Sequence, residues 1–163
     1  MRRNNNIIKL LKKGHIAAIV AICPFMACTP NIAYHHYEPV NKEGWDKRDT
    51  MYFTVDTILQ AADYTTTLCL RTNTAYPYCN FSTRVTQEVR HSGKSFTRRM
   101  DFNIVRKDGT QMGKGITLFT HEVPVATQHL QPGDTLMVKV GHNMRPETLH
   151  GIEDVGIKVT RKI

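Results

Sequence analysis

Apolar residues recur at every second position along most of the chain after residue 50. In the last stretch, Val155, Ile157 and Val159 alternate with small or polar residues. A period of two lines one face of an extended strand, whereas a helix needs a period near 3.6. The same alternation recurs in four earlier stretches: Phe53 and Val55; Tyr64, Leu68 and Leu70; Phe81 and Val85; and Leu136, Val138 and Val140. The pattern predicts β-strands with one dry and one wet face.

Turn-forming residues separate these stretches, as expected for short antiparallel strands. Such strands bury their dry faces by packing one sheet on another. We therefore expect an all-β fold, an antiparallel β-sandwich of jelly-roll type with seven to nine strands. We expect residues 50–163 to form this single domain and residues 28–49 to hold the lipidated cysteine and a tether. The turn residues are Asp63, Thr72-Asn73-Thr74, Asp108-Gly109 and Pro132-Gly133-Asp134.

The start of the chain has the composition of an export signal. Five basic residues come first, and an apolar run of 12 residues, 16–27, ends immediately before Cys28. This order is typical of secretory signals, and the run is shorter than the roughly 20 residues that a membrane-spanning helix needs. We expect residues 1–27 to be a lipoprotein signal peptide and Cys28 to carry the lipid. The basic residues are Arg2, Arg3, Lys9, Lys12 and Lys13.

Two alternatives concern the processing site. Cys23 is a second cysteine in the signal, but the bulky Ile22 precedes it, whereas the small Ala27 precedes Cys28. An ordinary secretory cut near Ala27 would leave Cys28 as a free thiol. If Cys28 is lipidated, its several acyl chains hold the protein on a lipid bilayer. The residues after Cys28 include neither an Asp at the next position nor an acidic cluster, so we expect the periplasmic face of the outer membrane.

The net charge of +8 does not indicate a nucleic-acid partner. Five of the 22 basic residues and none of the 14 acidic residues precede Cys28. The remaining chain therefore carries a net charge of only +3, and its basic residues are scattered among acidic ones. We expect no nucleic-acid binding.

Cys69 and Cys79 could form a disulfide in an oxidising compartment. If their two strands form a hairpin, matching the dry faces sets Leu68 against Phe81 and Leu70 against Cys79. Cys69 would then point away from Cys79, so we expect two separate thiols. A disulfide between them would require a β-bulge that shifts the register.

Two stretches carry distinctive motifs, LRTNTAYPYCNF at residues 70–81 and MRPETLHGIEDVGI at residues 144–157. Together with Trp45, Phe53 and the turn Gly113-Lys114-Gly115, they resemble the GldH gliding-motility lipoproteins of Bacteroidetes along essentially the whole mature chain. This chain departs from the family pattern in its loose signal motif, in Cys79 where serine is more usual, and in lacking an aromatic residue near the glycine turn. The resemblance implies a lipoprotein of the gliding apparatus and its associated secretion machinery, with no enzymatic activity.

Three aromatic residues within these regions have two interpretations. Pro77 favours extended geometry at Tyr76, which predicts that the rings of Tyr76 and Tyr78 pack across the start of a strand. Alternatively, Trp45, Tyr76 and Tyr78 form an exposed aromatic platform that binds a glycan or a protein.

Arg145 lies between a predicted strand and a loop that is rich in carboxylates. We expect its guanidinium to pin this loop against the final strand, with a partner or substrate contact as the alternative. The carboxylates belong to Glu147, Glu153 and Asp154.

We expect no metal, cofactor or catalytic centre. The histidines have no ligand spacing, and no glycine-flanked serine nucleophile or phosphate-binding glycine loop is present. The leading hypothesis is a non-enzymatic, membrane-anchored module that contacts envelope proteins of a motility or secretion assembly. The alternatives are a periplasmic glycan-binding module and a hydrolase whose residues converge only in the folded chain.

Overall fold

The structure, a computed structural model, describes residues 31–162. The predicted signal peptide (residues 1–27) and Cys28 lie outside the described residues. The strands are β1 (Ile32–Pro39), β2 (Trp45–Asp46), β3 (Met51–Val55), β4 (Ala62–Asn73), β5 (Asn80–Val89), β6 (Lys94–Asn103), β7 (Leu118–Leu130), β8 (Leu136–His142), β9 (Thr148–Leu149) and β10 (Ile152–Arg161). Residues 31–162 contain no helix, and hence none that could cross a membrane.

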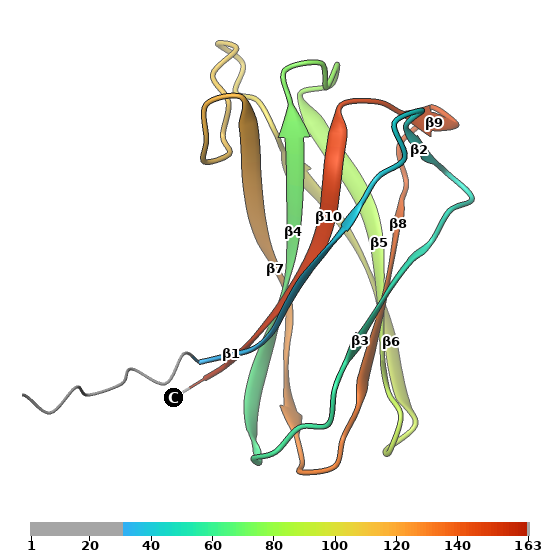
Figure 1. The fold of residues 1–163 in the computed structure, drawn as a ribbon, viewed down its shortest axis with the longest axis vertical. Helices are drawn as coiled ribbons and strands as arrows, with labels where there is room; N and C mark the ends of the chain where they lie inside the picture. The colour runs from blue at the N-terminus through green and yellow to red at the C-terminus, as the bar shows by residue number, and fades with distance from the viewer. Residues whose placement is uncertain (1–30, 163) are drawn as a thin grey trace, which may run out of the picture.

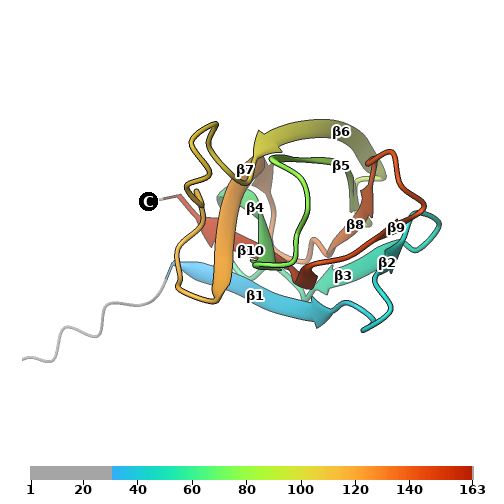
Figure 2. The same cartoon turned by 90° about the horizontal axis from the view of Figure 1, so that it is seen from above.

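The strands form two four-stranded antiparallel sheets that face each other (Figures 1 and 2). One sheet has the order β1-β10-β4-β7, and the other has the order β3-β8-β5-β6. The two-residue strands β2 and β9 can be left out and the eight long strands renumbered 1 to 8 in chain order. The two sheets then have the orders 1-8-3-6 and 2-7-4-5. This connectivity is that of a jelly roll, so the predicted fold class is confirmed. The β2–β9 pair adds a small ribbon at one end of the sandwich.

The alternating apolar residues fill the space between the sheets. All thirteen residues named from the alternation are buried; among them Leu68, Phe81 and Ile157 are fully inaccessible to solvent. Each strand therefore turns its predicted dry face inward, and the pattern identified the core correctly.

The predicted tether contains a strand, so the domain begins earlier than residue 50. β1 pairs with β10 at the edge of its sheet, with Tyr37 opposite Gly156. The strand was missed because it lies at an edge and most of its side chains are exposed or half-buried. An edge strand with two wet faces lacks the alternation that reveals a buried strand.

The strands of Cys69 and Cys79 do not form the hairpin on which the pairing argument was conditional. β4 pairs with β10 and β7, whereas β5 belongs to the opposite sheet. The matched pairs Leu68–Phe81 and Leu70–Cys79 are therefore not cross-strand neighbours. Both cysteines are free thiols, Cys69 buried and Cys79 exposed. Burial raises the pKa of Cys69 to about 11, which keeps this thiol protonated and unreactive at neutral pH.

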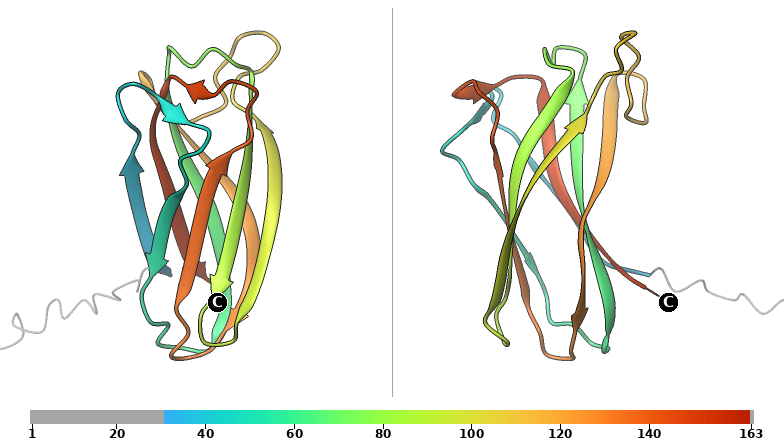
Figure 3. Two further views of the ribbon diagram at one scale, coloured as in Figure 1. Left: turned by 90° about the vertical axis from the view of Figure 1, so that its right-hand side faces the viewer. Right: turned by 180° about the vertical axis from the view of Figure 1, so that it is seen from behind.

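The sandwich has two distinct ends (Figures 1 and 3). The motif-bearing end consists of the loops at residues 40–44, 74–79, 104–117 and 143–151. The terminal end consists of the loops at residues 56–61, 90–93 and 131–135, beside the first described residue, Asn31. β4 runs from one end to the other, and its 12 residues span about 40 Å.

Candidate functional site

The two sequence motifs meet at the motif-bearing end. The first motif covers the end of β4 and the following loop, and the second leads into β10, which pairs with β4. The Asn73 backbone N–H donates to the Gly151 carbonyl at 2.9 Å, and the Asn73 side-chain amide donates to the Glu153 carboxylate. Stretches about 75 residues apart in the chain therefore form one hydrogen-bonded unit.

Gly151 allows this close approach. Its φ is +81°, and a Cβ atom at this position would collide with the backbone of Tyr76. Only glycine combines that backbone conformation with the missing side chain. The glycine of the second motif is thus required by the loop of the first.

Tyr76 and Tyr78 pack as the structural interpretation predicted. Tyr76 is buried, its hydroxyl donates to the Asn80 carbonyl at 2.8 Å, and its ring meets that of Tyr78 edge to face at 5.7 Å. Burial raises the pKa of Tyr76. Tyr78 is half-buried.

Trp45 lies in the core behind the same end. Only 1% of its surface is exposed; its ring stacks on Phe81 at 6.2 Å and meets His142 edge-on at 5.3 Å. Its Nε1 donates to the Asp49 carbonyl at 3.1 Å. Because Trp45 and Tyr76 are both buried, the exposed three-ring platform that a glycan site would need is not formed. That interpretation of the three aromatic residues is wrong.

His142 is held as a neutral imidazole against Trp45. Its Nε2 lies 3.1 Å from the Trp45 carbonyl oxygen, so Nε2 carries the proton and donates it. The Nδ1 atom is buried and has no hydrogen-bond partner among the described residues. Burial is the main cause that lowers the pKa of His142.

Arg145 does not pin the carboxylate-rich loop. Its side chain is exposed, and in residues 31–162 it forms no ion pair. Arg71 pairs with one of these carboxylates instead, and it joins strands rather than a loop: its Nη1 lies 3.4 Å from the carboxylate of Asp154 in β10, and its guanidinium lies 3.8 Å from the centre of the Tyr37 ring in β1. Sequence proximity favoured Arg145, whereas the register of β4 with β10 sets Arg71 directly opposite Asp154.

A polar cavity of about 330 Å³ lies at the motif-bearing end. It joins the loop after β1 to both motifs, and its walls carry opposite charges. A surface of this kind suits polar or charged groups of a binding partner rather than an apolar ligand. Its lining includes Val40, Lys42, Asn73, Ala75, His150 and Glu153.

The loop at residues 104–117 exposes apolar side chains at the same end. Ile116 is 90% exposed and Met112 48% exposed, beside the basic Lys114. Reciprocal backbone hydrogen bonds of 2.9 Å between Lys114 and Thr120 hold the base of the loop. The Gly113-Lys114-Gly115 turn was expected from the sequence, whereas Ile116 was not; its position directly after that turn was the available signal.

One hydroxyl–imidazole pair lies at this end and is the candidate to consider for catalysis. Thr72 Oγ1 lies 3.2 Å from His121 Nε2, which is a hydroxyl beside an imidazole. Both residues are buried, so a substrate cannot reach the hydroxyl. Burial lowers the pKa of His121. Within residues 31–162, no three His, Cys, Asp or Glu side chains gather where they could hold a metal ion.

Three comparisons place the chain among known proteins. The family model described as GldH lipoprotein matches residues 32–159, which include both motifs and all but the ends of the sandwich. No curated protein matches the chain.

Several solved structures share a distant likeness of fold. A family 35 carbohydrate-binding module from Clostridium thermocellum is 13% identical, with 79% of this chain and 92% of that chain covered and a TM-score of 0.41. The VP2 subviral particle protein of infectious bursal disease virus is 12% identical, with 87% and 36% covered and a TM-score of 0.36. A CocE/NonD family hydrolase from Staphylococcus aureus is 14% identical, with 80% and 31% covered and a TM-score of 0.35. Likeness at this level carries no information about ligand or activity.

Proposed function

The chain belongs to the GldH lipoprotein family, and from this premise we propose that it is a non-enzymatic component of a gliding-motility apparatus or its associated secretion machinery. It acts through protein–protein contacts in the cell envelope. Its anchor is a lipid on Cys28, and its place is the periplasmic face of the outer membrane. Two or more acyl chains hold a protein on a bilayer far more firmly than one.

The observation that carries the proposal is the convergence of both motifs at one end of the sandwich. The loops of that end lie away from Asn31, three residues after Cys28 (Figure 1). With the lipid attached near the terminal end, the motif-bearing end extends away from the bilayer by about 40 Å, the length of β4. This arrangement suits a module that holds a contact surface at a fixed distance from the bilayer.

The exposed side chains of the motif-bearing end indicate the kind of partner. Ile116 and Met112 present apolar surface, which is worth about 25 cal/mol for each Å² that a partner covers. The same loop also carries three basic residues, Arg106, Lys107 and Lys114, and a single acidic one, Asp108. The partner is therefore a protein with an apolar patch and acidic residues at its rim.

Photocrosslinking in intact cells tests the proposal. A photoreactive amino acid replaces Ile116, Arg145 or His150 at the motif-bearing end of the full-length chain. The control is Ser92, an exposed residue in a loop of the terminal end. We expect discrete adducts with an envelope protein, identified by mass spectrometry, from the three motif-end positions and at least fivefold less adduct from Ser92. Equal adducts at all four positions, or none at the motif end, would contradict the proposal.

A further inference from the structure

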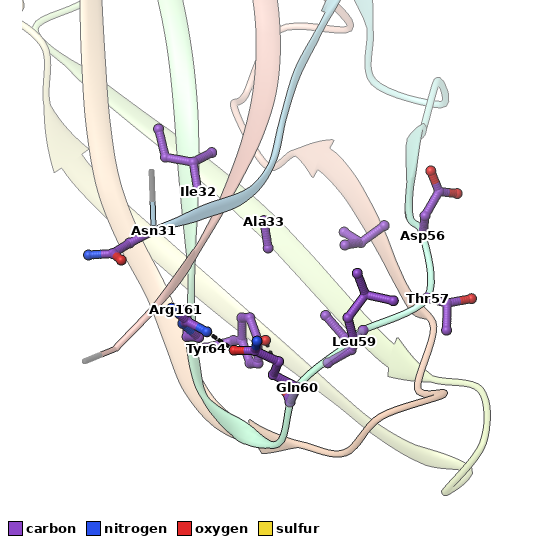
Figure 4. Close-up of a pocket in the computed structure, with 11 residues that line it drawn as sticks. Asn31, Ile32, Ala33, Asp56, Thr57, Leu59, Gln60, Tyr64 and Arg161 are labelled. Carbon is purple, nitrogen blue, oxygen red and sulfur yellow. Dashed lines mark hydrogen bonds between the residues drawn. The ribbon is translucent and has the colours of Figure 1, made fainter. Parts of the chain in front are cut away.

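A second cavity lies at the terminal end and has the opposite character to the polar one. Its volume is about 470 Å³, and it lies between the start of β1, the end of β10 and the connection from β3 to β4 (Figure 4). Most of its wall is aliphatic or aromatic. The lining includes Ile32, Val55, Ile58, Leu59, Tyr64 and Arg161.

The apolar wall has a buried floor and an exposed rim. Val55 and Ile58 form the floor and are almost fully buried. Leu59 and Ile32 lie at the rim, 84% and 47% exposed. Exposed aliphatic side chains on both sides of an open groove are a feature of sites that bind apolar ligands.

Two of the polar side chains of the wall are paired with Gln60, whereas the side chains of Asp56 and Thr57 are exposed to solvent. The Tyr64 hydroxyl donates to the Gln60 carbonyl at 3.0 Å, and the Arg161 guanidinium donates to the Gln60 side-chain oxygen. An occupant therefore needs few hydrogen-bonding groups of its own. The wall suits a flexible hydrocarbon better than a sugar or a peptide, whose polar groups would lose water without gaining partners.

The geometry points to one occupant, an acyl chain carried by Cys28 of the same molecule. Asn31 lines the cavity, and Cys28 precedes it by three residues. Three residues span at most about 10 Å, so a lipid on Cys28 starts within that distance of Asn31. The cavity volume falls within the range of about 300–1,000 Å³ that is common for small-ligand sites.

This inference rests on the lipidation included in the proposed function. Moving methylene groups from water into apolar surroundings is favourable. Like a bilayer, the groove offers an acyl chain apolar side chains to contact. The groove therefore shields one chain from water whenever that chain is not in the membrane.

A photoactivatable, clickable fatty acid tests the inference in cells that express the full-length chain. After irradiation, the purified protein is digested and the crosslinked peptides are mapped. We expect the acyl probe to be joined to peptides that contain residues 31–33 or 58–60. The variant Leu59→Asp should reduce this intramolecular crosslink at least fivefold. The variant Ile116→Asp, which changes an equally exposed aliphatic residue at the other end, should leave it unchanged.

The outcomes separate this inference from the proposed function. Probe attached to the protein but crosslinked only to lipids, or a Leu59→Asp variant with the wild-type yield, would overturn the acyl-binding site and leave the anchor intact. Absence of probe from the wild type, or equal probe on Cys28→Ala, would overturn both the site and the lipid anchor. The photocrosslinking from Ile116, Arg145 and His150 reports on the protein contact independently of either result.

Discussion

At the scale of single residues, three side chains form a stack on the outer face of the β1-β10-β4-β7 sheet. The Tyr37 ring lies across Gly156, and the Arg71 guanidinium lies over that ring at 3.8 Å. Cys69 is opposite Gly156 on the neighbouring strand. Burial is the first cause that raises the pKa of Tyr37 to about 12. The stack joins the edge strand β1 to the centre of its sheet.

Gly156→Ala should break this stack. A Cβ atom at position 156 would lie 2.6 Å from Tyr37 Cδ1 and 2.8 Å from the His36 carbonyl oxygen, so β1 must move. Overpacking of this kind costs about 1–3 kcal/mol in the free energy of unfolding, which urea denaturation measures.

Gly141→Ala is the matched control for this prediction. Gly141 is also a strand glycine, but a Cβ added there would lie 3.7 Å from Arg84 Nη2 and 4.0 Å from Thr50 Oγ1, which are ordinary van der Waals distances. Its free energy of unfolding should stay within about 0.5 kcal/mol of the wild type. A loss as large in Gly141→Ala as in Gly156→Ala would show that the Tyr37 contact is not the cause.

At the scale of elements, the small β2–β9 ribbon is fastened to the sandwich by two buried side chains, Trp45 and Leu149. Each of its strands has only two residues, and a two-stranded ribbon of this size is not stable by itself. Trp45 opposes Leu149 in the ribbon, and its ring contacts Phe81 and His142 of the β3-β8-β5-β6 sheet. The position of the motif-bearing loops therefore depends on this tryptophan.

Trp45→Ala should destabilise the protein by about 3–5 kcal/mol, because it leaves a large cavity and removes the anchor of the ribbon. Tyr52→Ala provides the comparison, since Tyr52 is an aromatic residue that is 61% exposed, and its loss should cost less than about 1 kcal/mol. Denaturation followed by circular dichroism measures both variants. Similar midpoints for the two variants would refute the anchoring role.

The sequence predicted the elements unequally well, for physical reasons. Alternation located Val155, Ile157 and Val159 in the core because a half-buried strand must show a period of two. It could not show that β4 and β5 enter different sheets, since both arrangements bury the same face. Arg71 was overlooked in favour of Arg145 because the pairing of Arg71 with Asp154 arises from strand register, which local sequence does not contain. Ile116 was also overlooked, because an exposed residue in a loop does not belong to any periodic pattern of apolar residues.

At the scale of the whole molecule, two buried histidines connect stability to pH. Burial lowers the pKa of both His121 and His142, so each remains neutral in the folded protein at pH values where the unfolded chain binds a proton. The unfolded state gains this proton below a pH of about 6.5. Stability is therefore fully present above that value and decreases as the pH falls towards the lowered pKa values.

The free energy of unfolding should thus decrease between pH 7 and pH 5, as measured by urea denaturation at a series of pH values. His142→Gln, which removes one titrating group and keeps a donor for the Trp45 carbonyl, should flatten that decrease. If the free energy of unfolding decreased equally with pH in the wild type and in His142→Gln, then His142 would not be a source of the pH dependence.

The jelly-roll connectivity also determines when this protein can fold. Among the described strands, β1 is the first and pairs only with β10, the last, with Ile32 opposite Thr160. A chain synthesised from its amino end presents β1 long before its partner emerges. Contacts between such distant segments form slowly. The sandwich can close only after β10 is available, so the unpaired first strand needs protection from aggregation until then.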